Sequence, residues 1–255
     1  TNMDYAELLK KHKEKKATAT IALCRVEDPS RYGIAELTKN NRIRKFVEKP
    51  DRRKAPGNLA NAGIYVLEPE LFDYIPGGRP VSIENEVFPK LAEEGKIYGH
   101  SFNGLWVDIG EPADYLKANW LLLDTVVKKS QLEKDVIVGN ETEIEAPSAV
   151  GEGATIGEAS KIGSLTAVGD HSVVGKGVRI ENSIVFARTR ISDFASIKGA
   201  IIGEGTVIGK RVEIEDGCLV GDHAVIEDNV RLTRGVSVCP FRTVTESVLT
   251  PKCLM

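Results

Sequence analysis

The chain has 255 residues, of which 42% are hydrophobic and 28% charged, and its net charge of −3 offers no basic excess for nucleic acid. No apolar run approaches the roughly 20 residues that a membrane-spanning helix needs. The four cysteines lack the Cys-x-x-Cys spacing of zinc and redox sites, so we expect a reducing cytoplasm as the compartment. The length is sufficient for two domains.

The first half of the sequence alternates between helical and strand-like patterns. Asn2 or Asp4 is suited to cap a helix that ends in a lysine cluster, which is typical of a solvated helix end. Strands are expected over residues 18–26, 34–37, 43–47, 61–66 and 96–102. Helices are expected over residues 83–94 and from Glu111 to about residue 127.

A six-residue repeat then fills the chain from Leu132 to about Thr243. A large aliphatic residue, here called the anchor, opens each repeat, and the phase slips by one residue near Phe186 and again after Ile197. Neither the α-helical period nor simple alternation fits so many positions. The eighteen anchors are Leu132, Val138, Ile144, Val150, Ile156, Ile162, Val168, Val174, Ile180, Ile191, Ile197, Ile202, Ile208, Ile214, Val220, Ile226, Leu232 and Val238.

Two further regularities accompany the anchors. Glycine follows the anchor in nine repeats, which we attribute to backbone angles that bulky residues resist at a corner: Gly139, Gly151, Gly157, Gly163, Gly169, Gly175, Gly203, Gly209 and Gly221. Four residues after the anchor the side chain is mostly small or β-branched, as at Ser148, Ala154 and Thr166. Both regularities predict a parallel β-helix in which each repeat is a short strand plus a corner.

The repeat resembles the hexapeptide-repeat family of left-handed β-helices, which implies three repeats per coil and therefore six coils. Many members of that family transfer acyl groups with a histidine, and others serve as scaffolds. His171 and His223 both occupy exposed Val-Gly-Asp-His corners, and no Pro-His-x-x-Tyr segment occurs between Ile180 and Val238. We therefore favour a scaffold over a sugar acyltransferase.

Four short motifs precede the repeat in a fixed order: Tyr32-Gly33, Glu48-Lys49-Pro50, Asn61-Ala62-Gly63-Ile64-Tyr65 and Trp106-Val107-Asp108-Ile109-Gly110. Each motif is weak alone, but together ahead of a β-helix they resemble the sugar-phosphate nucleotidyltransferases, or NDP-sugar pyrophosphorylases. The segment from Ser82 to Pro89 most resembles the GDP-mannose pyrophosphorylases, also called mannose-1-phosphate guanylyltransferases. Neighbouring branches make dTDP-glucose or UDP-glucose, so the choice of nucleotide and sugar stays open.

This resemblance implies in-line attack of a sugar-1-phosphate oxygen on the α-phosphate of a nucleoside triphosphate, with release of pyrophosphate. It implies that Lys49 contacts the sugar phosphate and Asp108 holds Mg²⁺, and these two are the expected catalytic residues. Glu48 would accept hydrogen bonds from sugar hydroxyls, and the remaining sugar-binding residues would be Gly33, Asn61, Ala62 and Gly63. Each residue alone has a structural explanation, such as a bend or a turn.

Glu84 and Glu86 are left out of the expected site. A glutamate in the first turn of a helix has a sufficient structural explanation in its attraction to the positive end of the helix.

The sequence also departs from the family pattern. These enzymes open with a Gly-Gly-x-Gly-Thr-Arg loop and a first metal-binding aspartate, and neither occurs here. We therefore expect the sequence to begin just downstream of that aspartate, as a truncated form that does not turn over alone. A non-catalytic paralogue that senses nucleotide sugars is the other reading of this departure.

The expected fold is α/β, the C-terminal part of a Rossmann-like nucleotidyltransferase domain, over residues 1–130. An all-β left-handed parallel β-helix with a C-terminal tail follows over residues 131–255. Because the ends of a β-helix are open strand edges, we expect homo-oligomers through this part. The tail from Phe241 onward is expected to cap the last coil or to meet a partner.

Overall fold

The computed structural model describes residues 1–254, and its contacts divide the chain into two compact units, residues 1–108 and the part from Ile109 onward. The first unit contains every helix and strand that the sequence predicts for this region. Its elements are α1 (Tyr5–Lys15), β1 (Ala19–Arg25), η1 (Pro29–Arg31), β2 (Ile34–Leu37), β3 (Ile43–Val47), β4 (Leu59–Leu67), η2 (Pro69–Tyr74), η3 (Ile83–Val87), α2 (Phe88–Glu93) and β5 (Ile97–Ser101).

Two details of these elements differ from the sequence prediction. The helix expected over residues 83–94 begins with the π-helical turn η3, capped by Ser82, before α2. The short helices η1 and η2 were not expected.

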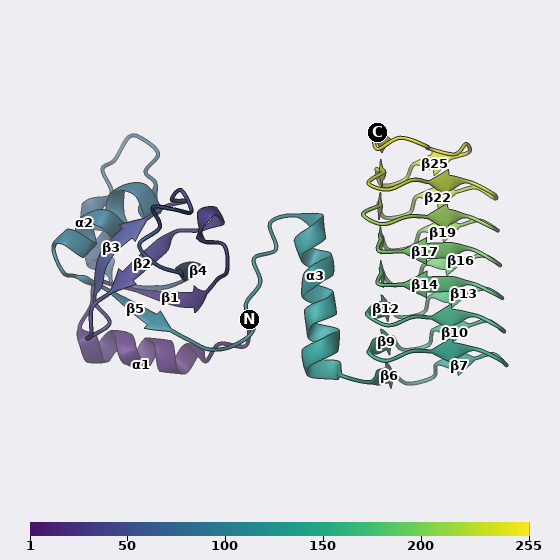
Figure 1. Ribbon diagram of the computed structural model, residues 1–255, viewed down its shortest axis with the longest axis horizontal. Helices are drawn as coiled ribbons and strands as arrows, with labels where there is room; N and C mark the ends of the chain where they lie inside the picture. The colour runs from purple at the N-terminus through teal and green to yellow at the C-terminus, as the bar shows by residue number, and fades with distance from the viewer. Residues whose placement is uncertain (255) are drawn as a thin grey trace. The chain divides into compact units, whose positions relative to one another are not determined.

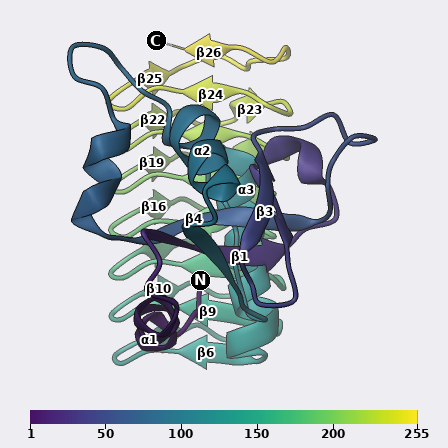
Figure 2. The same ribbon diagram turned by 90° about the vertical axis from the view of Figure 1, so that its left-hand side faces the viewer.

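The five strands form one mixed sheet in the order β3-β2-β4-β1-β5. The interior strand β1 runs antiparallel to β4 and parallel to β5. Its side chains alternate between two cores: Ile21 and Leu23 pack with α2, whereas Ala22 and Cys24 pack with Leu8 of α1. Figures 1 and 2 show α1 and α2 on opposite sides of this sheet. Burial on both faces explains the uninterrupted apolar run of β1.

Helix α1 begins and packs as its sequence predicts. Asp4 is the N-cap, and its Oδ1 accepts hydrogen bonds from the backbone N–H groups of Ala6 and Glu7 at 2.9 and 3.1 Å. His12 on its inner face is only 1% exposed, and its ring nitrogens each lie 2.9 Å from an oxygen, Thr20 Oγ1 and Glu68 Oε1. These partners satisfy the buried ring.

The second unit contains a left-handed parallel β-helix, in which successive coils stack and their strands form three parallel sheets (Figure 1). One sheet has seven strands: β7 (Ile137–Val138), β10 (Thr155–Ile156), β13 (Val173–Val174), β16 (Arg190–Ile191), β19 (Val207–Ile208), β22 (Val225–Ile226) and β25 (Thr243–Val244). Another has six: β8 (Glu143–Ile144), β11 (Lys161–Ile162), β14 (Arg179–Glu181), β17 (Ser196–Lys198), β20 (Glu213–Ile214) and β23 (Arg231–Leu232). The third has eight: β6 (Ser130–Leu132), β9 (Ser148–Val150), β12 (Thr166–Val168), β15 (Ile184–Val185), β18 (Ile201–Ile202), β21 (Leu219–Val220), β24 (Ser237–Val238) and β26 (Cys253–Leu254).

The described part of this β-helix has seven coils, so the expectation of six was wrong. Val185 is an anchor that the repeat count passed over, because the step from Ile180 is five residues long. The tail adds the remaining coil: β25 pairs with β22, Val248 bridges Leu232, and β26 pairs with β24. The tail therefore continues the coil.

The core of the β-helix is formed by the anchors and by the small residues four positions later. Anchors from Val150 onward are buried, and so are the small residues, among them Ser160 and Thr206. Their hydroxyl groups donate to backbone carbonyls, Ser160 to Gly175 at 2.8 Å and Thr206 to Gly203 at 2.8 Å. In the first coil, Leu132 remains 47% exposed.

The nine glycines that follow anchors have a different cause from the one expected. None of them has a positive φ, so backbone angles do not require glycine there. A Cβ at Gly157 would lie 2.6 Å from the backbone of Gly175, and one at Gly169 would lie 2.5 Å from the backbone nitrogen of Ala187. Glycine is needed at these positions because the next coil approaches so closely.

Helix α3 (Pro112–Leu122) continues into the π-helical η4 (Leu123–Val127) and covers the outer face of the eight-stranded sheet. Leu116 packs against the outward side chains of Ile184 and Ile201, and Trp120 Nε1 donates to the Asn182 carbonyl at 3.0 Å. The two steps of five residues, Ile180 to Val185 and Ile197 to Ile202, lead into the strands that carry these contacts. In the described residues no helix is long and apolar enough to cross a membrane.

The other two faces of the β-helix differ in chemistry. The six-stranded sheet presents mostly charged residues, and Lys161 pairs with Glu143 at 3.3 Å while Arg231 pairs with Glu213 at 3.5 Å. The seven-stranded sheet presents mostly uncharged β-branched residues. These outward residues are Ile137, Thr155, Val173, Val207, Val225 and Thr243, with Arg190 among them.

Candidate functional site

The motifs of the first unit converge on one cavity of about 230 Å³, next to the start of β4. Six of the seven expected site residues line it: Gly33, Glu48, Asn61, Ala62, Gly63 and Asp108. The cavity also contains Arg31, Tyr32, Tyr65, Glu84 and Trp106, which were not among the expected site residues. This volume lies below the roughly 300–1,000 Å³ of pockets for drug-sized ligands and suits a monosaccharide.

Glu48 reaches the cavity from the end of β3, alongside Gly33. A Cβ on Gly33 would lie 2.6 Å from Glu48 Oε2 and 2.5 Å from Phe46 Cζ, so only glycine leaves the carboxylate its place. Burial first, and the neighbouring charge of Glu84 second, raise the pKa of Glu48, whereas Lys49 opposes this shift. The carboxylate is thus partly desolvated, which strengthens any hydrogen bond that it accepts.

Asn61 and Tyr65 from β4 form a short polar chain across the cavity. Asn61 Nδ2 donates to Tyr65 Oη at 2.8 Å, and the Asn61 Oδ1 accepts from the Gly63 N–H at 2.9 Å. Gly63 has φ of +71°, which explains a glycine at that bend. Tyr65 Oη in turn lies 3.4 Å from Glu84 Oε1.

Glu84, which was left out of the expected site, lines the cavity. The residue belongs to η3, whose N-cap Ser82 directs it toward Tyr65 and the end of β4. Glu86, which was also left out, pairs with Arg79 at 2.6 Å and does not line the cavity. Local helix position does not distinguish these two glutamates.

Trp106 connects the last motif to the third. Its indole Nε1 donates to the carbonyl of Ala62 at 3.0 Å, and its ring meets Tyr32 edge-on with centroids 5.4 Å apart. These contacts hold the segment that carries Asp108 at the rim of the cavity, where the Asp108 side chain is exposed. Tyr65 and Trp106 stood within the recognised motifs, which was the signal that they belong to the pocket.

Lys49 is the one expected residue that does not line the cavity. It is exposed, and its backbone N–H donates to the Tyr32 carbonyl at 3.0 Å while its φ is +43°, an uncommon angle for a residue with a side chain. The cation in the cavity lining is Arg31, whose guanidinium lies 5.9 Å from the Tyr32 ring centroid. In the sequence, the only indication that Arg31 lines the cavity is that it directly precedes the Tyr32-Gly33 motif.

The fit of a metal ion depends on Asp108. Within residues 1–254 no group of three or more His, Cys, Asp and Glu side chains is placed to hold a metal. Mg²⁺ is usually bound by one or two carboxylates together with substrate phosphates, so a single aspartate at the rim is compatible with it.

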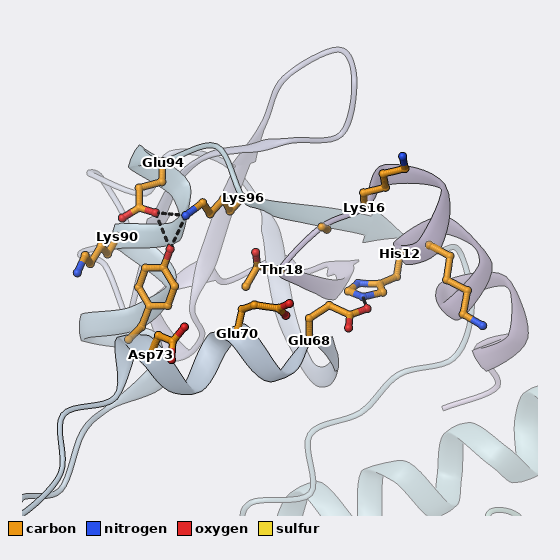
Figure 3. Close-up of a pocket in the computed structure, with 12 residues that line it drawn as sticks. His12, Lys16, Thr18, Glu68, Glu70, Asp73, Lys90, Glu94 and Lys96 are labelled. Carbon is orange, nitrogen blue, oxygen red and sulfur yellow. Dashed lines mark hydrogen bonds and ion pairs between the residues drawn. The ribbon is translucent and has the colours of Figure 1, made fainter.

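A larger cavity, of about 820 Å³, lies at the other end of β4, and Figure 3 shows acidic and basic side chains interspersed around it. Lys96 Nζ donates to Tyr74 Oη at 2.7 Å and pairs with Glu94 at 2.8 Å, and His12 pairs with Glu68. None of the four motifs reaches it, so size alone does not identify the site.

The two β-helix histidines are corner residues, as expected. His171 and His223 have φ of +55° and +56°, are exposed, and follow aspartates whose Oδ1 accepts a backbone hydrogen bond from the preceding coil. His223 stacks on Phe241 with ring centroids 5.0 Å apart. These contacts give the two aspartates and His223 a structural role.

Comparison with known proteins gives the same assignment for both units. Residues 1–125 match the family model described as nucleotidyl transferase, and residues 144–254 match the model of the GMPPB C-terminal domain. The chain is 36% identical over 256 residues to a mannose-1-phosphate guanyltransferase of Pichia angusta, covering 98% of this chain and 68% of that protein. It is 37% identical over 253 residues to mannose-1-phosphate guanylyltransferase 1 of Arabidopsis thaliana, covering 98% and 67%. The chain therefore belongs to the nucleotidyltransferase family, in the branch of the mannose-1-phosphate guanylyltransferases.

Proposed function

We propose that the protein forms GDP-mannose and pyrophosphate from GTP and mannose-1-phosphate. The observation that carries this proposal is the convergence of Gly33, Glu48, Asn61 and Asp108 on one monosaccharide-sized cavity. The printed names of the relatives support the choice of mannose-1-phosphate and a guanylyl group. We further propose the cytoplasm as its compartment, which the four free cysteines favour.

In this reaction an oxygen of the sugar phosphate attacks the α-phosphorus of the nucleotide, and the bond to the leaving pyrophosphate breaks. Both reactants are anionic, so their approach needs positive charge and fixed geometry. Glu48 and Asn61 hold the sugar through its hydroxyls. Arg31, which lines the cavity, and Lys49, which adjoins Glu48 in the chain, are the cations proposed to bind the sugar phosphate. Asp108 would hold Mg²⁺, which when bound neutralises charge on the phosphates.

The test is a substrate panel. GTP, UTP and dTTP are each combined with mannose-1-phosphate and glucose-1-phosphate, and pyrophosphate release is measured with the product of the complete open reading frame. We expect the pair of GTP and mannose-1-phosphate to react fastest, and the variants Lys49→Ala and Asp108→Asn to lose most of that activity. Gly57→Ala is the matched control, because a Cβ there would meet nothing within 4 Å.

Other outcomes of the panel have definite meanings. Preference for UTP or dTTP with glucose-1-phosphate would replace the proposed substrates with those of a neighbouring branch. Nucleotide-sugar binding without any pyrophosphate release would make the protein a sensor.

We also propose that the β-helix mediates self-association through its seven-stranded sheet. Ile137, Val173 and Val207 are 64%, 47% and 38% exposed on this face. Of the other two faces, α3 covers that of the eight-stranded sheet, and the six-stranded sheet carries charged residues in ion pairs. A flat face of β-branched residues is complementary to a second flat sheet, and a second copy supplies one. The occupant is therefore another copy of this chain.

Light scattering after size exclusion tests this surface. Val207→Lys is expected to reduce the oligomeric mass, whereas Ser196→Lys on the charged six-stranded face is expected to leave it unchanged. A monomeric wild-type protein, or an oligomer that both variants preserve, would overturn the assignment.

A further inference from the structure

Glu84 is the one carboxylate of the cavity to which the proposed reaction gives no role. It lines the cavity together with Glu48, and Tyr65 Oη lies 3.4 Å from its Oε1. Ser82 Oγ lies 3.4 Å from its other oxygen, Oε2. Two neutral hydroxyl groups from different elements therefore orient this side chain.

The position is supported by packing beneath it. Tyr65 meets Phe88 edge-on with ring centroids 5.3 Å apart, and Phe88 is fully buried at the start of α2. Ser82 Oγ accepts from the Asn85 N–H at 3.2 Å and so caps η3, the turn that carries Glu84. A carboxylate held on supported elements is preorganised for binding.

Two carboxylates in one small cavity select a particular kind of ligand group. An ionised carboxylate accepts hydrogen bonds and donates none, so a ligand must bring donors to both. Phosphate oxygens would be repelled, whereas sugar hydroxyls are donors without charge. Hydrogen bonds to ionised acceptors are also the stronger ones. The chemistry of this wall therefore matches the hydroxyl face of a hexose and not its phosphate.

We propose that Glu84 is a specificity-determining residue of the sugar pocket, where it accepts hydrogen bonds from hexose hydroxyls beside those bound by Glu48. This inference rests on the proposed function, since it takes the ligand of the cavity to be a sugar phosphate. In this proposal the carboxylates of Glu48 and Glu84 both accept hydrogen bonds from the sugar, and Tyr65 orients that of Glu84.

The alternative is that Glu84 only braces Tyr65. Glu84→Gln separates the two roles, because an amide oxygen still accepts from the Tyr65 hydroxyl while the negative charge is lost. Glu86→Gln is the matched control, being two residues away, paired with Arg79 and outside the cavity. Tyr65→Phe removes the hydroxyl that orients Glu84.

Calorimetric titration of the 255-residue chain with mannose-1-phosphate, and separately with inorganic phosphate, measures both roles. Glu84→Gln is expected to weaken mannose-1-phosphate binding by about tenfold or more, the worth of a charged hydrogen bond, and to leave phosphate binding unchanged. Tyr65→Phe is expected to give a smaller loss of the same kind. Glu86→Gln is expected to change neither affinity.

A mannose-1-phosphate analogue that lacks one hydroxyl at a time identifies the group that Glu84 contacts. For the correct analogue, wild type and Glu84→Gln are expected to bind equally well. The inference is overturned if Glu84→Gln binds mannose-1-phosphate as wild type does, or if it loses phosphate and sugar phosphate to the same degree. If the wild-type chain binds phosphate but no hexose phosphate, the proposed function itself falls, and this inference with it.

Discussion

The indole Nε1 of Trp106 donates a 3.0 Å hydrogen bond to the carbonyl oxygen of Ala62. This single contact joins the motif that carries Asp108 to the motif that carries Asn61, although the two are 44 residues apart in sequence. Because both segments line the same cavity, the bond holds Asn61 and Asp108 in one arrangement.

Trp106→Phe keeps the ring that packs on Tyr32 but removes this donor. The Ala62 carbonyl then lacks its partner, which costs about 0.5–1.5 kcal/mol. We expect weaker mannose-1-phosphate binding by several-fold in calorimetric titration. Trp120→Phe in the second unit serves as the control, and an equal loss there would show that the effect is not local to the cavity.

Gly33→Ala tests the close approach beside Glu48. A Cβ would meet Phe46 and Glu48 at 2.5 and 2.6 Å, so strand and carboxylate must shift, at a cost of about 1–3 kcal/mol in the free energy of unfolding. Urea denaturation in a Trp120→Phe background, where Trp106 fluorescence reports the first unit, measures it. Gly57→Ala in the same background should be neutral, and matching midpoints for both variants would contradict the crowding argument.

The raised pKa of Glu48 gives sugar binding an acid limb. Burial and the charge of Glu84 raise this pKa, so the accepting carboxylate is lost at a higher pH than for an ordinary glutamate. Mannose-1-phosphate affinity should therefore fall as pH drops through the raised pKa. In Glu84→Gln only burial still raises the pKa, so the acid limb should move to lower pH, whereas Glu86→Gln should leave it in place.

The same shift has a consequence for stability. The pKa of Glu48 is higher in the folded than in the unfolded protein. Its contribution to the free energy of unfolding is therefore fully present below the unfolded pKa, and it is lost as pH rises through the window between the unfolded and the folded pKa. Comparing urea midpoints of wild type and Glu48→Gln on both sides of the window checks the sign. A larger advantage of wild type above the window would refute it.

Two adjacent residues of β14 test the inward and outward positions of the coil. Ile180 is fully buried, so Ile180→Ala should cost about 2–5 kcal/mol in unfolding free energy. Arg179 points outward and is exposed, so Arg179→Ala should change stability by no more than about 0.5 kcal/mol. Trp120 fluorescence in a Trp106→Phe background reports this unit. Similar costs for both would contradict the assigned register.

The sequence predicted those parts of the fold that depend on local pattern. A six-residue period identifies the β-helix because every coil repeats the same burial, and the caps and strands of the first unit follow from Asp4 and from apolar runs such as that of β1. Val185 was missed because it follows the anchor Ile180 by five residues, whereas a strict period looks for an anchor six residues on. The tail escaped because Val248 closes a coil without a full repeat.

The candidate site was predictable only where motifs carry it. Glu84 and Glu86 look alike in sequence, and only the fold distinguishes them, since one meets Tyr65 and the other Arg79. The cause of the glycines after the anchors was likewise hidden. The distance between successive coils decides it, and that distance is not a property of any single repeat.

The two five-residue steps of the β-helix lie beside the surface on which helix α3 packs. Both lead into the strands whose outward residues, Ile184 and Ile201, meet Leu116, and Trp120 bonds to the shortened turn at Asn182. The site where α3 packs thus coincides with the two shortened turns as well as with these apolar side chains. The length of these two turns is therefore as much a part of the helix-binding face as the side chains of Ile184 and Ile201.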